Sequence, residues 1–307
     1  MGTVVISIDA ELGWGVHDAE APVERVAAAR DGWQFLVDLL DAHGIPATWA
    51  VAGHLLLDEC DRRHESHPLG PAWFARERTT LADRPELRFA DGLVEAVRES
   101  DPDHEIGCHG FSNVELGHPE TTAATARAEL AAACRAAQVR GIDLSTFVFP
   151  NNSIGHRGEL AAAGFSCYRG VIPNRSGHHR KLLDAMVGSS SPRLVAPAVD
   201  EWGLVDVPAS LHLFEFDGLT RALLEPAFGD PVVDHVERGL DELADSDRVF
   251  HLWLKPSSVE TDRDRRRLRA VCSSISERRD TIDIETMGAV AERVSPTPAY
   301  TAAEGTG

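Results

Sequence analysis

The hydrophobic pattern begins with a short β-branched run, Val4 to Ile8, which is typical of a strand buried in a parallel sheet. Residues 23–44 follow with apolar positions mostly at helical spacing, and they end in Gly44, a common helix stop. Residues 47–51 then form a second apolar segment. This order of strand, helix and strand indicates a βαβ unit.

Strands and helices keep alternating along the chain, which predicts an α/β fold with parallel strands in a sheet or barrel. Further strands are expected in the segments HEIGCHGF, LSTFVFP, GFSCYRG, LVDVPAS, RVFHLWLKP and DTIDIE. Polar residues 58–85 and 172–195 are expected to be surface insertions. No repeat or linker divides the chain, so we expect one domain over residues 1–294 and a disordered tail at 295–307.

The charge of the chain is strongly negative. Asp and Glu number 49 against 30 Lys and Arg, which gives a formal net charge of −19, and only Lys181 and Lys255 are lysines. An acidic surface repels phosphate backbones and anionic lipids, which argues against binding to nucleic acid or membranes. Such a surface is also typical of proteins adapted to high salt, whereas GC-rich coding would explain the arginine bias but not the acidity.

Cysteine usage and the N-terminal residues favour a cytoplasmic protein. The five cysteines are scattered and never spaced as CxxC, so neither a disulfide framework nor a zinc–thiolate site is expected. The sequence MGTVVISIDAELGWG lacks the basic, apolar and cleavage regions of a signal peptide. No apolar run reaches the length of a membrane span.

Polar side chains stand near the ends of almost all expected strands, where parallel α/β folds gather functional groups. The first strand ends in Asp9 and Glu11, the second runs toward His54, and the third ends at His109. The candidates after these are Asn113, Asn151, Asn152, Arg169, His251 and Lys255. Each has an ordinary alternative as a helix cap, a solvated acid, a core histidine or a turn asparagine. Their common placement at strand ends favours a site.

Six segments resemble, in order and approximate spacing, the polysaccharide deacetylase family, which is the NodB-homology domain of carbohydrate esterase family four. They are ISIDAELGWG, IPATWAVAGHLL, EIGCHGFSNVEL, FVFPNN, AAAGFSCYRG and FHLWLKPSSV, and they span most of residues 3–260. The resemblance implies a distorted (β/α) barrel, usually seven-stranded. It also implies a hydrolase that removes N- or O-acetyl groups from sugars with a divalent metal, commonly zinc.

The resemblance further implies roles for the residues of the first and third segments. Asp9 is expected as the catalytic base, and Glu11 and His109 are expected as metal ligands. Asn113 stands in the position of the second metal histidine. Two adjacent aspartates are usual in the family, so the Ala10-Glu11 pair is a departure from its pattern.

The later segments also depart from the family pattern, at the closing histidine and at Val148. The closing histidine, which is the general acid, corresponds to His251 or to the position of Lys255, and Val148 replaces a frequent arginine. We expect the carbohydrate substrate to contact Trp14, Asn151, Asn152 and Arg169.

Amide hydrolysis explains why these residue types are expected together. A metal held by histidines and a carboxylate lowers the pKa of water, a carboxylate removes its proton, and a histidine protonates the leaving amine. Asparagine is a neutral and weaker ligand for zinc, so Asn113 leaves the metal site open to question. The alternatives are a carbohydrate-binding pseudoenzyme and a metal-independent amidase that uses Asp9 and His251. A cytoplasmic setting favours a soluble sugar, nucleotide-sugar or oligosaccharide substrate.

Overall fold

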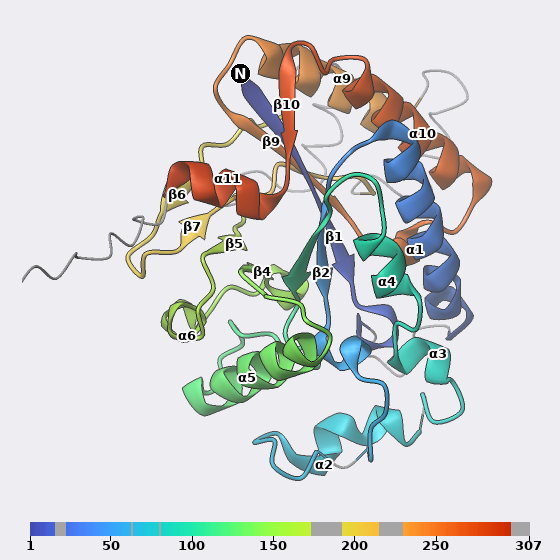
Figure 1. Ribbon diagram of the computed structural model, residues 1–307, viewed down its shortest axis with the longest axis vertical. Helices are drawn as coiled ribbons and strands as arrows, with labels where there is room; N and C mark the ends of the chain where they lie inside the picture. Colours follow the sequence, from blue (N-terminus) through green and yellow to red (C-terminus); the bar gives the residue numbers. More distant parts are fainter. Residues whose placement is uncertain (16–22, 63, 80, 173–191, 215–229, 296–307) are drawn as a thin grey trace, which may run out of the picture.

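The computed structural model describes residues 1–15, 23–62, 64–79, 81–172, 192–214 and 230–295, and its centre is one curled sheet of mainly parallel strands (Figure 1). The strands are β1 (Gly2–Ala10), β2 (Thr48–Val51), β3 (Glu105–Cys108), β4 (Thr146–Val148), β5 (Cys167–Arg169), β6 (Ala198–Val199), β7 (Val205–Asp206), β8 (Leu211–His212), β9 (Val249–Leu254) and β10 (Ile282–Glu285). Their order is β6-β7-β5-β4-β3-β2-β1-β9-β8, with β10 paired to β1.

The sheet curls into a distorted barrel because the segment that contains β7 and β8 pairs at both edges. Strand β7 pairs in parallel with β5, and β8 pairs in parallel with β9. Between these strands, Ala209 N donates to Gly170 O, directly after β5, and Ser210 N donates to His251 O of β9. The segment thus passes from pairing with β5 to pairing with β9. In the described part of the chain the interior is therefore surrounded by β1, β2, β3, β4, β5, the β7–β8 segment and β9. The expected seven-stranded barrel is confirmed.

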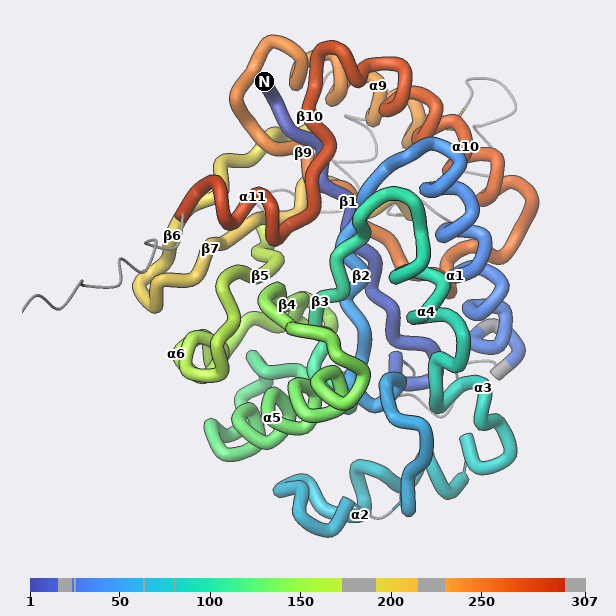
Figure 2. The backbone as a smooth tube through the Cα atoms, in the orientation of Figure 1, coloured from blue at the N-terminus to red at the C-terminus, as the bar shows by residue number. Residues whose placement is uncertain are grey.

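Helices cover the outside of this barrel (Figures 1 and 2). They are α1 (Val23–His43), α2 (Gly70–Trp73), α3 (Pro85–Arg88), α4 (Leu93–Arg98), α5 (Ala123–Val139), α6 (Arg157–Ala162), α9 (Pro231–Ala244), α10 (Asp262–Ser276) and α11 (Met287–Val294). Short 3-10 turns are η1 (Leu12–Gly15), η2 (Gly53–Leu56), η3 (Phe74–Glu77), η4 (Pro150–Asn152) and η5 (Pro256–Ser258). Helices α1, α10 and α9 lie side by side on one flank, and α2 lies beyond the ends toward which β1 and β2 run. None of the helices in the described ranges is both long and apolar enough to cross a membrane.

Helix α10 is an element that the hydrophobic pattern did not predict. Its first half, DRDRRRLR, is densely charged, so a count of hydrophobic residues does not reveal the apolar face of the helix. A capping box between Thr261 and Asp264 starts the helix, because each residue's side chain accepts a hydrogen bond from the other's backbone N–H. Leu268, Val271, Cys272 and Ile275 then recur at helical spacing on the buried face.

Strand β1 is longer than the predicted run Val4–Ile8, and all nine of its residues are buried. Its first half pairs with β10, its second half pairs with β2, and β9 pairs with it along residues 3–8. Three strands together therefore shield it. The insertion at 58–85 contains the short helices that we expected there. Most of the expected loop at 172–195 and almost all of the tail at 295–307 lie outside the described residues. The single domain over 1–294 stays a prediction.

The net charge of −19 leads to a prediction about salt. If the acidic surface is an adaptation to salt, raising potassium chloride from about 0.05 M to about 1 M should raise the melting temperature steeply, because the screening length falls from roughly 14 Å to about 3 Å and repulsion between carboxylates weakens. Circular dichroism melts would measure this, with sucrose as a non-ionic control for solute exclusion. A melting temperature that does not change across the series would leave ordinary acidic composition as the explanation.

Candidate active site

Three parallel strands deliver charged or ionisable side chains to the same end of the barrel. Asp9 lies on β1 beside Ala50 of β2, and Glu11 follows directly after β1. His109 follows β3, and its backbone N–H donates to Val51 O of β2. Lys255 follows β9, whose Leu254 pairs with Ile8 of β1. Because the strands run in parallel, their carboxyl ends meet at one mouth.

Asp9 forms a buried ion pair with Arg169, the last residue of β5. Arg169 Nη1 donates to Asp9 Oδ1 at 2.6 Å, and Nη2 donates to Oδ2 at 3.0 Å. The guanidinium also donates to Ser7 Oγ at 3.1 Å and lies 4.4 Å above the ring of Trp253. Burial opposes ionisation of the acid, but Arg169 outweighs it and lowers the pKa of Asp9 to about 2. Asp9 is therefore a carboxylate at any working pH.

Glu11 lies between His109 and Lys255. Lys255 Nζ donates to Glu11 Oε1 at 2.7 Å, and Glu11 Oε2 lies 3.3 Å from His109 Nε2. His109 Nδ1 lies 2.9 Å from Val148 O, and since a carbonyl only accepts, this nitrogen carries the imidazole proton. The lone pair of His109 Nε2 therefore faces a carboxylate oxygen inside the protein. Burial opposes the charge on Glu11, but the ammonium group of Lys255 outweighs it and holds the pKa of Glu11 below its ordinary value.

His251 lies deeper in the barrel than Lys255. Its Nδ1 lies 3.1 Å from Val207 O, and its Nε2 lies 2.9 Å from Ser7 Oγ, which also accepts from Arg169. Burial and the charge of Arg169 lower the pKa of His251 to about 3, so the imidazole is neutral at physiological pH. Of the two positions considered for the closing histidine, the structure brings that of Lys255 to the mouth and links His251 to Asp9 through Ser7 and Arg169.

Asn113 has a positive φ of 64°, a left-handed conformation that asparagine adopts more readily than most residues. Its Nδ2 donates to the backbone oxygen of Trp14 at 3.0 Å. The turn that joins His109 to Asn113 is held by Glu129 of α5, whose carboxylate accepts from the backbone N–H groups of Phe111 and Ser112, both at 2.8 Å. Sequence reasoning missed Glu129, because nothing within an alanine-rich helix shows which buried turn it will face.

The residues expected to contact substrate divide into two groups. Trp14 and Arg169 are fully buried. Asn151 and Asn152 are accessible to solvent, and both have positive φ. They therefore also fit the alternative given above, that they are asparagines of a turn. Asn151 donates to Glu115 Oε1 at 2.8 Å, whereas Asn152 Oδ1 accepts from Arg169 at 3.0 Å. Their roles toward a substrate stay predictions.

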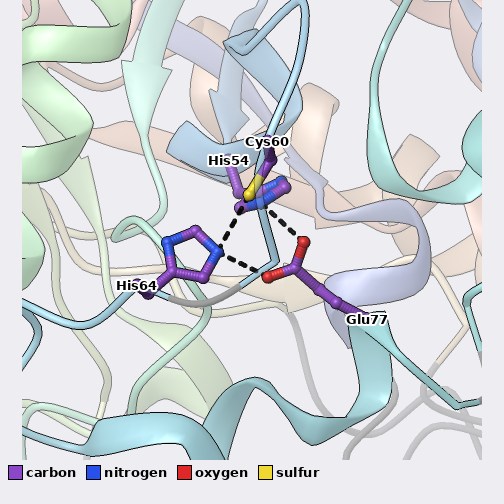
Figure 3. Close-up of side chains that lie close together, drawn as sticks. All are labelled: His54, Cys60, His64 and Glu77. Atoms are coloured by element: carbon purple, nitrogen blue, oxygen red, sulfur yellow. Dashed lines mark hydrogen bonds and ion pairs between the residues drawn. The ribbon is translucent and has the colours of Figure 1, made fainter.

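A second group of ionisable side chains lies where the insertion at 58–85 meets the end of β2, and it borders Trp14, one of the residues predicted for the site. It consists of His54, Cys60, His64 and Glu77, whose nitrogen, sulfur and oxygen atoms lie within 4.8 Å of one another and could hold a metal ion (Figure 3). His54 was a candidate only because of its strand end, and the spacing of the cysteines did not indicate a metal site. The ring of Trp14 lies against His54, with centroids 4.2 Å apart.

Comparisons with known proteins identify the fold. No protein-family model matches the sequence, and no curated protein matches it. Among solved structures, a protein assigned as a polysaccharide deacetylase from Mycobacterium smegmatis aligns with a TM-score of 0.61 and 18% identity over 95% of this chain and 89% of its own. A probable polysaccharide deacetylase from Pseudomonas aeruginosa PAO1 and Puue allantoinase both give 0.59 and 14% over 96% of this chain, and over 92% and 91% of their own chains. The chain therefore has the NodB-like deacetylase fold that the resemblance implied.

Proposed function

We propose that the protein is a hydrolase that removes an acetyl group from a carbohydrate by cleaving a carbon–nitrogen bond, and that its reaction centre is the barrel mouth. The proposal is carried by one observation: Asp9, Glu11, His109 and Lys255 arrive from three different strands and interact there. Two of the similar folds are assigned as polysaccharide deacetylases, and the third is an allantoinase. The carbohydrate substrate rests on this fold-level analogy.

We further propose that the mouth binds the divalent metal, which we take to be zinc, with Glu11, His109 and Asn113 as its ligands. Glu11 Oε2 and His109 Nε2 fit such an ion, because both are buried lone-pair atoms, 3.3 Å apart, without a hydrogen bond among the described residues. A divalent ion held there would supply Lewis acidity for the attack of water on an acetyl carbonyl. Lys255 already pairs with Glu11 Oε1, so we expect weaker zinc binding than at an uncompensated carboxylate.

Each charged side chain then has a distinct part in hydrolysis. Asp9 has lone pairs beyond the two that Arg169 engages, and with these it accepts the proton of the attacking water and then returns it to the leaving amine nitrogen as the carbon–nitrogen bond breaks. Burial opposes the charge of Lys255, but Glu11 and Asp9 outweigh it and raise the pKa of the ammonium group. Lys255 therefore remains positive and stabilises the negative oxygen that develops during attack. His251 is neutral and positions Arg169 through Ser7.

A soluble carbohydrate in the cytoplasm is the substrate class that we favour. All five cysteines are free, which suits a reducing compartment. The net charge of −19 disfavours polyanionic substrates such as nucleic acid and anionic membrane surfaces. An N-acetylated sugar, nucleotide-sugar or short oligosaccharide remains compatible with the mouth.

A carbohydrate-binding pseudoenzyme is the second candidate, and a specific observation favours it. Both carboxylates of the mouth are already paired with cations, Asp9 with Arg169 and Glu11 with Lys255. Acetate release would separate the candidates when N-acetylglucosamine, its oligosaccharides and an N-acetylated nucleotide-sugar are each incubated with protein, with and without zinc. Release of acetate supports the hydrolase. Sugar binding by calorimetry without any release would overturn it in favour of the pseudoenzyme.

Restoring an imidazole at position 113 should strengthen the metal site at the mouth. Asn113→His replaces a weak neutral donor by the nitrogen that zinc prefers, and histidine also tolerates the positive φ of this position. We expect zinc affinity at the mouth to rise by about tenfold or more, because even a residue that only supports a metal ligand contributes about 10–100-fold. Calorimetric titration in a Cys60→Ser/His64→Ala background, which leaves the second group two of its four ligands, would measure it. Unchanged or weaker binding would show that Asn113 is not a ligand position.

A further inference from the structure

Four side chains with metal-binding atoms converge where the insertion meets the end of β2. His54 is in η2, directly after β2, whereas Cys60, His64 and Glu77 come from the insertion (Figure 3). His54 and Glu77 are fully buried, and Cys60 and His64 are half-buried. One thiol, two imidazoles and one carboxylate are a donor set that suits zinc.

Hydrogen bonding orients His54 toward the centre of this group. Its Nδ1 lies 3.2 Å from the backbone oxygen of Arg88, so that nitrogen carries the proton. The lone pair of Nε2 then lies 3.1 Å from Glu77 Oε2, with no hydrogen-bond partner among the described residues. A histidine that donates one ring N–H to a backbone carbonyl and turns its other nitrogen inward has the arrangement found in metal sites.

The hydrogen atoms available within this group are too few to give every donor–acceptor contact a hydrogen bond. His64 Nε2 lies 2.5 Å from Glu77 Oε1 and 3.1 Å from Cys60 Sγ, but this nitrogen has at most one proton for two acceptors. A metal ion in place of this proton would be contacted by all three atoms, because metal binding displaces protons from such ligands.

The spacing of the donor atoms agrees with one tetrahedral ion. Zinc bonds of about 2.0–2.3 Å place the ligand atoms of a tetrahedral site roughly 3.3–3.8 Å apart. The separations of 2.5 and 3.1 Å are hydrogen-bond distances shorter than this range, so the side chains would move apart by less than about 1 Å to admit an ion, and all the atoms lie within 4.8 Å of one another. Arg88 Nη2, at 3.0 Å from Glu77 Oε2, supports the carboxylate from outside the group.

We propose that His54, Cys60, His64 and Glu77 bind a structural zinc ion that fastens the 58–85 insertion to the end of β2. Four protein ligands leave no open position for water, which distinguishes this site from a catalytic one. The ring of Trp14 lies against His54, and the backbone oxygen of Trp14 accepts from Asn113. The ion therefore also supports the segment that borders the barrel mouth, without taking part in the reaction proposed there.

Cobalt(II) substitution tests the proposal on the full chain, because only this site includes sulfur. After removal of metal with a chelator, cobalt should produce a thiolate-to-cobalt charge-transfer band and the intense visible bands of a tetrahedral ion. Cys60→Ser should abolish the charge-transfer band. Cys134→Ser, which alters another half-buried cysteine, and His109→Ala, which alters the mouth, should both retain it.

Protection of the thiol is the second measurement. With zinc at about ten times its dissociation constant, alkylation of Cys60 should slow roughly tenfold, because only metal-free chains react. Labelling of Cys134 should not change. Failure of the wild-type protein to show the charge-transfer band, or zinc-independent labelling of Cys60, would overturn the site. The wild-type results decide the question even if Cys60→Ser does not fold.

Discussion

Replacing Asp9 by asparagine should lower the rate of acetate release by about 10²–10⁴-fold, the range that a general base contributes. The substitution is nearly isosteric, and an amide oxygen can still accept one hydrogen bond from Arg169, so the site keeps its shape while losing the carboxylate. Initial rates of acetate release on the best substrate of the panel would measure the loss. The rates should be divided by the folded fraction at the assay temperature, because Arg169 keeps a buried charge in this variant.

Asp38→Asn is the matched control for this prediction. It also removes one carboxylate, but from the exposed side of α1, where the acid accepts from Gln34 of the same helix. Its rate should equal that of the wild type. If Asp9→Asn retained activity within a few-fold of the wild type, Asp9 would be a structural partner of Arg169, and the base would have to be sought elsewhere.

Replacing Arg169 by methionine should lower the free energy of unfolding by about 3–5 kcal/mol, because it leaves the buried Asp9 carboxylate without its counter-charge. The guanidinium is fully buried and also holds Ser7 and Asn152, so the change removes several contacts at once. Urea unfolding followed by circular dichroism, at constant ionic strength, would measure the difference.

Two further variants would show that the loss comes from the buried pair. Arg157→Met breaks ion pairs with Asp200 and Glu201 at a partly exposed position, and it should cost only about 0–1 kcal/mol. The double variant Asp9→Asn/Arg169→Met should lose less stability than the sum of the two single variants, because it leaves no unpaired charge. Additive losses would show that the pair is not energetically coupled.

The fold could be predicted from local sequence patterns. Alternating apolar strands and helices require parallel strands, and parallel strands bring their carboxyl ends together. The placement of Asp9, Glu11, His109 and Lys255 at one mouth follows from this rule. Helix α10 was missed because capping and a narrow apolar face, rather than overall hydrophobicity, determine it.

The chemistry of the site was less accessible to the same reasoning. From sequence, Arg169 was expected to contact substrate, yet it is buried against Asp9, 160 residues away in the chain. Lys255 pairs with Glu11 across 244 residues because β9 lies parallel to β1 and the two side chains follow the ends of these strands. The group around Cys60 combines a strand end with three positions in an irregular insertion, for which no period or spacing exists to be recognised.

The sequence by itself therefore determined the order of most of the elements, the parallel direction of the strands and the ionisable residues near the strand ends, whereas the barrel form was implied by the family resemblance. These properties depend on side-chain periodicity and on the fixed direction of neighbouring strands, both of which are written locally in the chain. Only the tertiary structure decided which charges neutralise one another, which histidine lies at the mouth and which lies in the core, and that His54 meets Cys60, His64 and Glu77. Ion pairs and metal sites require atoms within a few ångströms, and that proximity is set by the packing of distant segments.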